Sequence, residues 1–155
     1  MINYIRCTDK DREALSCVQI DPDELKDDGT KFDGIKVIKP WGCEIENYRD
    51  ENFSVWWLKL YEGKETSMHC HPNKSTCLII VSGRVIFSTL TGEHDLTVGD
   101  IMVIEKGAFH KTASSNGAAS LFEIESPPNK KDLIRLSDSY GRGQGYEISL
   151  HKEII

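Results

Sequence analysis

The chain has 155 residues, of which 39% are hydrophobic and 28% are charged, and its formal net charge is -6. This length and composition are typical of one globular domain with its own core, and no apolar run approaches the ~18 residues of a membrane span. The negative charge, without a cluster of lysines and arginines, offers no surface for nucleic acid. Five cysteines without C-x-x-C spacing favour reduced thiols over a disulfide framework.

The first segment, residues 1–34, is rich in Asp, Glu and Lys and contains turn signals such as Asp27-Asp28-Gly29. It predicts an N-terminal arm that either forms a short helix over 11–17 or runs extended along the rest of the protein. Its first residues lack the apolar core of a secretory signal, so we expect a cytoplasmic protein. Because such arms cover sheet edges between two copies, we also expect a homodimer.

From residue 35 to residue 126, short apolar or alternating segments are separated by Gly, Asp and Asn, which predicts an all-β barrel. Within the segment 53–61, Trp56, Leu58 and Leu60 share one face, so we expect them to point to the interior. No long segment has the helical period, which favours a jelly roll, or double-stranded β-helix. The predicted strands are 35–39, 42–47, 53–61, 66–71, 76–82, 84–90, 93–97, 101–104, 107–115 and 119–126.

The last segment, residues 127–155, begins with two prolines and contains glycines that interrupt any continuous helix. We expect a C-terminal tail, formed by a loop or a short helical turn, that packs on the barrel. Its basic residues Lys131, Arg135 and Arg142 are candidates for binding phosphate, since a guanidinium group offers paired donors to phosphate oxygens.

Three histidines form the clearest chemical pattern. His69 and His71 lie one residue apart in a strand-like segment, so their side chains point to the same face. His110 follows a glycine in a second such segment. Three imidazoles that leave coordination positions open suit Zn, Fe, Mn or Ni. The sequence therefore predicts a divalent metal ion bound by these three side chains.

The spacing of these residues resembles the two motifs of the cupin family, G-x5-H-x-H-x(3,4)-E-x6-G and G-x5-P-x-G-x2-H-x3-N. The matching residues are Gly63, His69, His71, Gly83, Gly99, Gly107 and His110. Three positions differ, because Thr76 replaces the glutamate, Glu105 the proline and Ser114 the asparagine. The resemblance implies a jelly-roll barrel whose metal set lacks the family's glutamate.

Two flanking segments narrow this resemblance. Residues 39–42 (KPWG) and 132–142 (DLIRLSDSYGR) are similar to the flanks of cupins in type II mannose-6-phosphate isomerases and at the C-terminus of mannose-1-phosphate guanylyltransferases. The branch implies a phosphorylated or nucleotide-activated sugar as the small-molecule ligand. The candidate substrate-binding residues are Thr76, Lys131, Arg135, Tyr140 and Arg142.

Two carboxylates are candidates for proton transfer. Glu65 shares the strand parity of the histidine pair, and Glu123 lies on the last predicted barrel strand. With a metal ion, either could support isomerisation or epimerisation of a sugar. The missing motif glutamate leaves two alternatives open. One is a three-histidine non-haem iron dioxygenase, and the other is a non-catalytic cupin that binds a sugar or sugar nucleotide.

Overall fold

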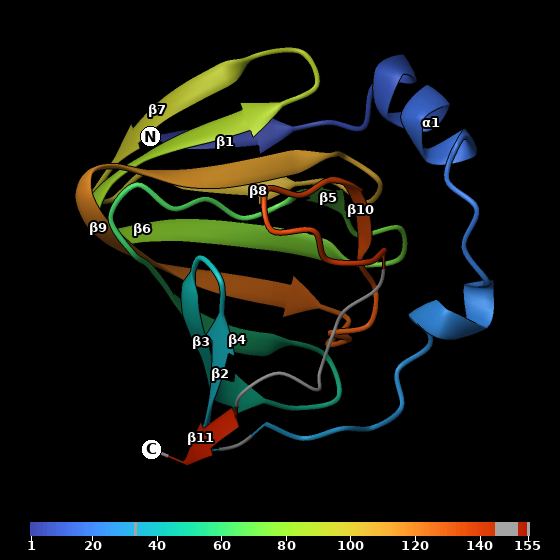
Figure 1. The fold of residues 1–155 in the computed structure, drawn as a ribbon, viewed down its shortest axis with the longest axis horizontal. Coiled ribbons are helices and arrows are strands. Elements are labelled where there is room, and N and C mark those ends of the chain that lie inside the picture. The colour runs from blue at the N-terminus through green and yellow to red at the C-terminus, as the bar shows by residue number, and fades with distance from the viewer. Residues whose placement is uncertain (33, 145–151, 155) are drawn as a thin grey trace.

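The computed structural model describes residues 1–32, 34–144 and 152–154. These residues form one α-helix, one 3-10 helix and a sheet of eleven strands that curls into a barrel (Figure 1). The elements are β1 (Ile2–Ile5), α1 (Asp9–Ser16), η1 (Pro22–Leu25), β2 (Ile35–Lys39), β3 (Gly42–Arg49), β4 (Ser54–Leu60), β5 (Met68–Cys70), β6 (Ser75–Thr89), β7 (Glu93–Thr97), β8 (Ile101–Ile104), β9 (His110–Ser126), β10 (Ile134–Ser137) and β11 (Lys152–Ile154).

The strands follow the order β1-β8-β6-β9-β4-β3-β2-β11, with β7 paired to β6 and β5 placed between β9 and β10. Neighbouring strands are antiparallel, except that β1 runs parallel to β8. This arrangement is a jelly-roll barrel, so the predicted all-β class is confirmed. The helix α1 lies outside the barrel, beyond the ends of its strands (Figure 1).

Two pairs of predicted strands are in fact single long strands. The predicted segments 76–82 and 84–90 join in β6, and 107–115 and 119–126 join in β9. Gly83, read as a break, is a bend inside β6 with a φ of 77°. A Cβ atom there would lie 2.5 Å from the carbonyl oxygen of Ala118, so glycine permits the close approach of β6 and β9.

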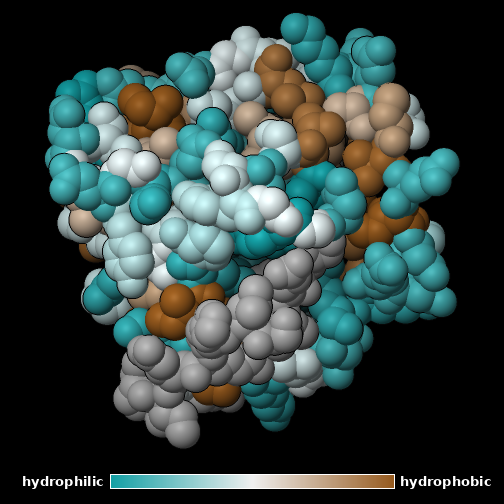
Figure 2. All heavy atoms as spheres, in the orientation of Figure 1, coloured by the Kyte–Doolittle hydropathy of each residue, from teal (hydrophilic) through white to brown (hydrophobic). Residues whose placement is uncertain are grey.

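The core fills the barrel. Trp56, Leu58 and Leu60 on β4 are 0%, 6% and 1% exposed, which confirms their predicted inward direction. The main apolar cluster joins them to side chains from β2, β6, β8 and β9. Hydrophilic side chains cover most of the face seen in Figure 1, and hydrophobic ones show between them in smaller groups (Figure 2).

A second, smaller cluster joins both terminal segments to the barrel. It consists of Leu25 from the arm, Cys70 from β5, Phe109 before β9 and Ile134 from β10, with α1 packed against it. Side chains far apart in sequence are therefore neighbours at the end of the barrel where β5 and β9 begin.

The arm contains the predicted short helix, as α1, and also the extended strand β1. The helix begins at a capping box in which the Thr8 hydroxyl accepts from the backbone of Asp11, and the Asp11 carboxylate accepts from the backbone of Thr8. The arm thus adds an edge strand to the sheet of its own chain. No helix among the described residues is long and apolar enough to span a membrane.

Where a loop or helical turn was expected, the described part of the tail, residues 127–144 and 152–154, contains the strands β10 and β11. Residues 134–137 form β10, which pairs with β5 next to the histidine pair. Pairing with β5 and burial of Ile134, which is 2% exposed, decide this conformation in place of local preference. Within the predicted tail, residues 145–151 and 155 lie outside the described residues.

Candidate metal centre

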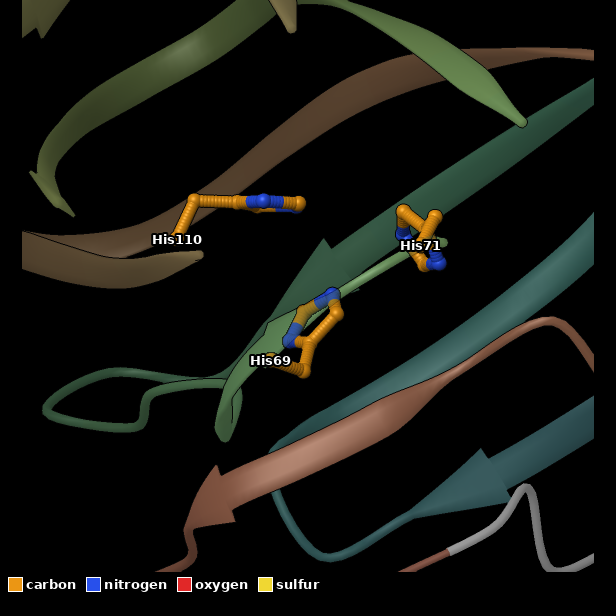
Figure 3. Close-up of side chains that lie close together, drawn as sticks. All are labelled: His69, His71 and His110. Atoms are coloured by element: carbon orange, nitrogen blue, oxygen red, sulfur yellow. The ribbon is translucent and has the colours of Figure 1, made fainter. Parts of the chain in front are cut away.

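The three histidines meet where β5 and β9 begin to pair. His69 lies in β5, His71 follows it directly, and His110 opens β9 as the cross-strand partner of His69. One ring nitrogen from each residue lies within 4.8 Å of the other two. Figure 3 shows the three rings turned toward one common space. The geometry can hold one metal ion, and the residues are those predicted from the spacing.

Each imidazole is fixed in one tautomer by a backbone carbonyl. The Nδ1 atoms of His69, His71 and His110 lie 2.8, 2.6 and 3.0 Å from the carbonyl oxygens of Ser67, Asp132 and Ala108. Because a carbonyl oxygen can only accept, each Nδ1 carries the proton and each Nε2 keeps its lone pair. Buried Nε2 of His71 has no hydrogen-bond partner, as expected for an atom aimed at a metal ion.

Burial also keeps these rings in the state that binds metal. Removal from water lowers the pKa of His69 and His71 well below the usual range and lowers the pKa of His110 to about 4. All three rings are therefore neutral near pH 7. Three neutral imidazoles with oriented lone pairs fit a divalent transition metal such as Zn, Fe, Mn or Ni.

The metal-free protein should lose stability as the pH falls below about 6.5. In the unfolded chain the histidines take protons near that pH, whereas folded His110 stays neutral down to about 4. Since the unfolded state then binds more protons, the free energy of unfolding decreases by about 1.4 kcal/mol per pH unit for each histidine. For His110 this window runs from about pH 6.5 to about pH 4.

Urea unfolding of chelator-treated protein at about pH 7 and about pH 5.5 measures this dependence. A His110→Gln variant should show a slope that is smaller by the contribution of one histidine. Equal free energies of unfolding at the two pH values would contradict the prediction.

The position of the motif glutamate does not supply a fourth ligand. Thr76 on β6 is buried, its hydroxyl has no hydrogen-bond partner, and it does not line the cavity beside the histidines. In the described part of the chain, no Asp, Glu or Cys joins the group formed by the three rings. Glu123 is a carboxylate near them, with Oε1 3.9 Å from Nε2 of His71.

The histidines form part of the wall of a cavity that opens to solvent. Leucines from several strands make up much of the apolar wall. The charged lining consists of five cations and three carboxylates, namely Lys39, Lys74, Lys130, Arg135, Arg142, Glu44, Glu123 and Glu125.

The lysines and glutamates among these charges form a buried network that reaches the histidines. Nζ of Lys130 lies 3.5, 3.2 and 2.9 Å from carboxylate oxygens of Glu44, Glu123 and Glu125, and 4.0 Å from the ring centre of Trp56. Lys74 pairs with Glu125 at 2.9 Å. The network continues to the histidines through Glu123, so the metal centre and the charged wall are one connected site.

The sequence analysis missed most of this wall. Lys39 pairs with Glu44 at 3.4 Å, and burial lowers the pKa of Lys39 to about 8. The available signal was strand parity, because Glu44 and Glu46 alternate on β3 as Glu123 and Glu125 do on β9. Charged residues at inward positions are rare enough that such alternation indicates a polar site.

The structure separates the remaining candidates into two groups. Glu123, Arg135 and Arg142 line the cavity with the histidines. Arg142 also pairs with Asp138 at 2.6 Å, and Arg135 donates to the Gly143 carbonyl at 2.6 Å. The cavity therefore receives basic side chains from the tail.

Glu65, Lys131 and Tyr140 do not line the cavity. The Glu65 carboxylate lies 2.9 Å from Lys111, and the Tyr140 hydroxyl donates to the Glu65 carbonyl at 2.9 Å. Lys131 pairs with Asp28 at 2.9 Å. The parity argument for Glu65 does not hold because β5 begins only at residue 68. The Glu65 carboxylate instead forms an ion pair with Lys111 near the surface.

Comparison with known proteins agrees with the fold. Residues 56–125 match the family model described as Cupin domain. Among solved structures, the chain is similar to KdgF from Halomonas sp., with 15% identity, a TM-score of 0.58, and 61% of this chain and 87% of that chain covered. No curated protein matches the sequence.

Two further structures share the architecture. One is a protein with a double-stranded β-helix domain from Klebsiella pneumoniae, with 14% identity, a TM-score of 0.56 and coverage of 78% and 97%. The other is a sugar phosphate isomerase from a cupin superfamily of Silicibacter pomeroyi, with 15% identity, a TM-score of 0.50 and coverage of 72% and 76%. At these identities the similarity concerns the fold.

Proposed function

We propose that this chain, which carries a cupin domain over residues 56–125, is a metal-dependent isomerase or epimerase of a phosphorylated or nucleotide-activated sugar. The observation that carries the proposal is the cavity itself. Its wall combines three oriented imidazole nitrogens with the buried carboxylate of Glu123, and its cationic side chains outnumber its carboxylates. The flanking segments 39–42 and 132–142 favour the mannose-6-phosphate isomerase and guanylyltransferase branch.

The charges favour an anionic ligand. The protein as a whole has a net charge of -6, yet the cavity lining holds five cations and three carboxylates. Arg135 and Arg142 enter from the tail and suit phosphate oxygens. One structure with this architecture is named a sugar phosphate isomerase, which is consistent with such a ligand.

A divalent metal ion bound by the three histidines would act as a Lewis acid toward neighbouring hydroxyl and carbonyl oxygens of the sugar. Glu123 is the side chain we assign to proton transfer. Its side chain is 8% exposed, its Oε1 lies 3.9 Å from Nε2 of His71, and burial raises its pKa above that of a free glutamate. Lys130 holds the carboxylate in place at 3.2 Å.

The test begins with metal analysis of protein purified without chelator, followed by aldose–ketose turnover of sugar phosphates in D₂O. Glu123→Gln should keep its metal and lower kcat by about 10²–10⁴-fold, because it cannot accept the proton. Glu93→Gln, the same change at an exposed position, should leave turnover unchanged. Protein without stoichiometric metal, or full turnover by Glu123→Gln, would contradict the proposal.

A second candidate is supported by the donor set, since no carboxylate of the described residues joins the three histidines. Iron in the purified protein, with O₂ consumption and no isomerisation, would favour a three-histidine dioxygenase. If His110→Ala binds sugar phosphate as tightly as the wild type, a non-catalytic sugar-binding cupin is favoured instead.

We also propose a cytoplasmic homodimer. In the sheet order, β1 is a terminal strand, and its Ile2 and Tyr4 side chains are 56% and 64% exposed. Pairing of this edge with a second copy would cover both side chains. A sedimentation mass equal to that of one chain would contradict it.

A further inference from the structure

A buried aspartate of the N-terminal arm contacts the strand that carries His110. Asp11 is the third residue of α1 and is 4% exposed. Its Oδ2 accepts from the backbone and hydroxyl of Thr8, at 2.8 and 2.6 Å, within the capping box. Its Oδ1 accepts from the backbone N–H of Phe109 at 2.9 Å. Helix capping accounts for the contacts of Oδ2 but not for the hydrogen bond that Oδ1 accepts from Phe109.

The hydrogen bond between Asp11 and Phe109 is connected to His110, a proposed metal ligand, through one peptide group. The N–H of Phe109 and the C=O of Ala108 belong to the same peptide unit. That C=O accepts from Nδ1 of His110 at 3.0 Å. The chain of hydrogen bonds therefore runs from the Asp11 carboxylate, through the 108–109 peptide, to the imidazole.

Such a chain of hydrogen bonds affects the basicity of the imidazole as well as its orientation. A carboxylate that accepts from a peptide N–H polarises the peptide and makes its C=O a stronger acceptor. A stronger acceptor for Nδ1–H makes Nε2 a better metal ligand. His71 is held differently, because the peptide after Asp132 donates its N–H to the neutral carbonyl of Lys131 at 2.8 Å.

We infer that Asp11 is a positioning residue of the metal centre, which acts on His110 through the Ala108–Phe109 peptide and raises the metal affinity of the site. The inference rests on the three-histidine metal centre proposed above. It assigns a role to the arm, which lies outside the residues that match the family model. A helix of eight residues thereby becomes part of the site.

The experiment uses Co²⁺ as the probe and chelator-treated full-length protein. Asp11→Asn keeps the side-chain shape and removes the charge. We expect its Kd for Co²⁺, measured by competition with a chelator, to rise by about 10–100-fold. In ¹H–¹⁵N spectra of the metal-free protein, the Nδ1–H resonance of His110 should shift, while those of His69 and His71 should not.

Two matched variants separate this role from helix stability. Asp9→Asn makes the same charge change on the same helix, at a side chain that is 98% exposed, and should bind Co²⁺ like the wild type. Thr8→Ala removes the capping hydroxyl and should cost about 1 kcal/mol of stability. Because it leaves Oδ1 of Asp11 on Phe109, it should keep its Co²⁺ affinity within about twofold.

The inference is overturned if Asp11→Asn binds Co²⁺ within twofold of the wild type with an unshifted His110 resonance. It is also overturned if Thr8→Ala loses as much affinity as Asp11→Asn. If Asp11→Asn does not fold, Asp11→Ser carries the same expectation and the same contrary outcome. A wild-type protein that binds no Co²⁺ would instead refute the metal centre itself.

Discussion

Replacing His71 by alanine should raise the Kd for Zn²⁺ or Co²⁺ by more than about 100-fold, beyond the loss expected for a residue that only orients a ligand. Its Nε2 is buried and without a hydrogen-bond partner, and its Nδ1 lies 2.6 Å from the Asp132 carbonyl. The ring is therefore already held in the direction of the metal. Two imidazoles alone fall short of the three protein ligands usual in catalytic sites.

His94→Ala is the matched control. His94 lies on β7, contacts Phe87 with ring centres 6.3 Å apart, and does not line the cavity. Its replacement should leave one metal ion bound per chain. Competition with a chelator and metal analysis measure both variants. Metal retained at full stoichiometry in His71→Ala would show that the three rings are not the ligand set.

Two of the metal ligands could be predicted because their geometry is local. Alternation along one short strand puts His69 and His71 on the same side. His110 was predicted from its spacing in the second cupin motif, and its cross-strand pairing with His69 is seen only in the structure. The residues that hold these rings could not be predicted in the same way. Asp11, near the start of the chain, contacts the backbone beside His110 through its carboxylate. Asp132, near the end of the chain, contacts the His71 ring through its backbone carbonyl. No sequence spacing encodes those contacts.

Most strands could also be predicted, because alternation along a strand is local. The errors in the predicted strands have physical causes. Glycine occurs both in turns and where two backbones approach closely. Gly83 is a case of close backbone approach and not of a turn between strands. The segment 134–137 becomes a strand only because β5 offers it a partner. Of the inward glutamates of β3 and β9, only Glu123 was predicted as a site residue, because charged side chains usually lie at the surface and that rule fails in a polar cavity.

Replacing Glu125 by leucine should lower the free energy of unfolding by about 3–5 kcal/mol, the cost of removing one partner from a buried ion pair. Glu125 is fully buried, and its Oε1 lies 2.9 Å from Nζ of both Lys74 and Lys130. Burial raises the pKa of Glu125, but the two lysines outweigh it and hold the pKa at about 2. The carboxylate thus stays ionised in the folded state, and the loss should persist from about pH 8 to about pH 5.

Glu62→Leu, the same change at an exposed position, should stay within about 0.5 kcal/mol of the wild type in urea unfolding. A loss of similar size in Glu125→Leu would contradict the prediction. The double variant Lys74→Met with Glu125→Leu should lose less than the single one, since it removes the unpaired ammonium as well. A barrel that tolerates an apolar pair here does not need these charges to fold. Their position beside Glu123 and the histidines then points to the cavity and its ligand as the reason they are buried.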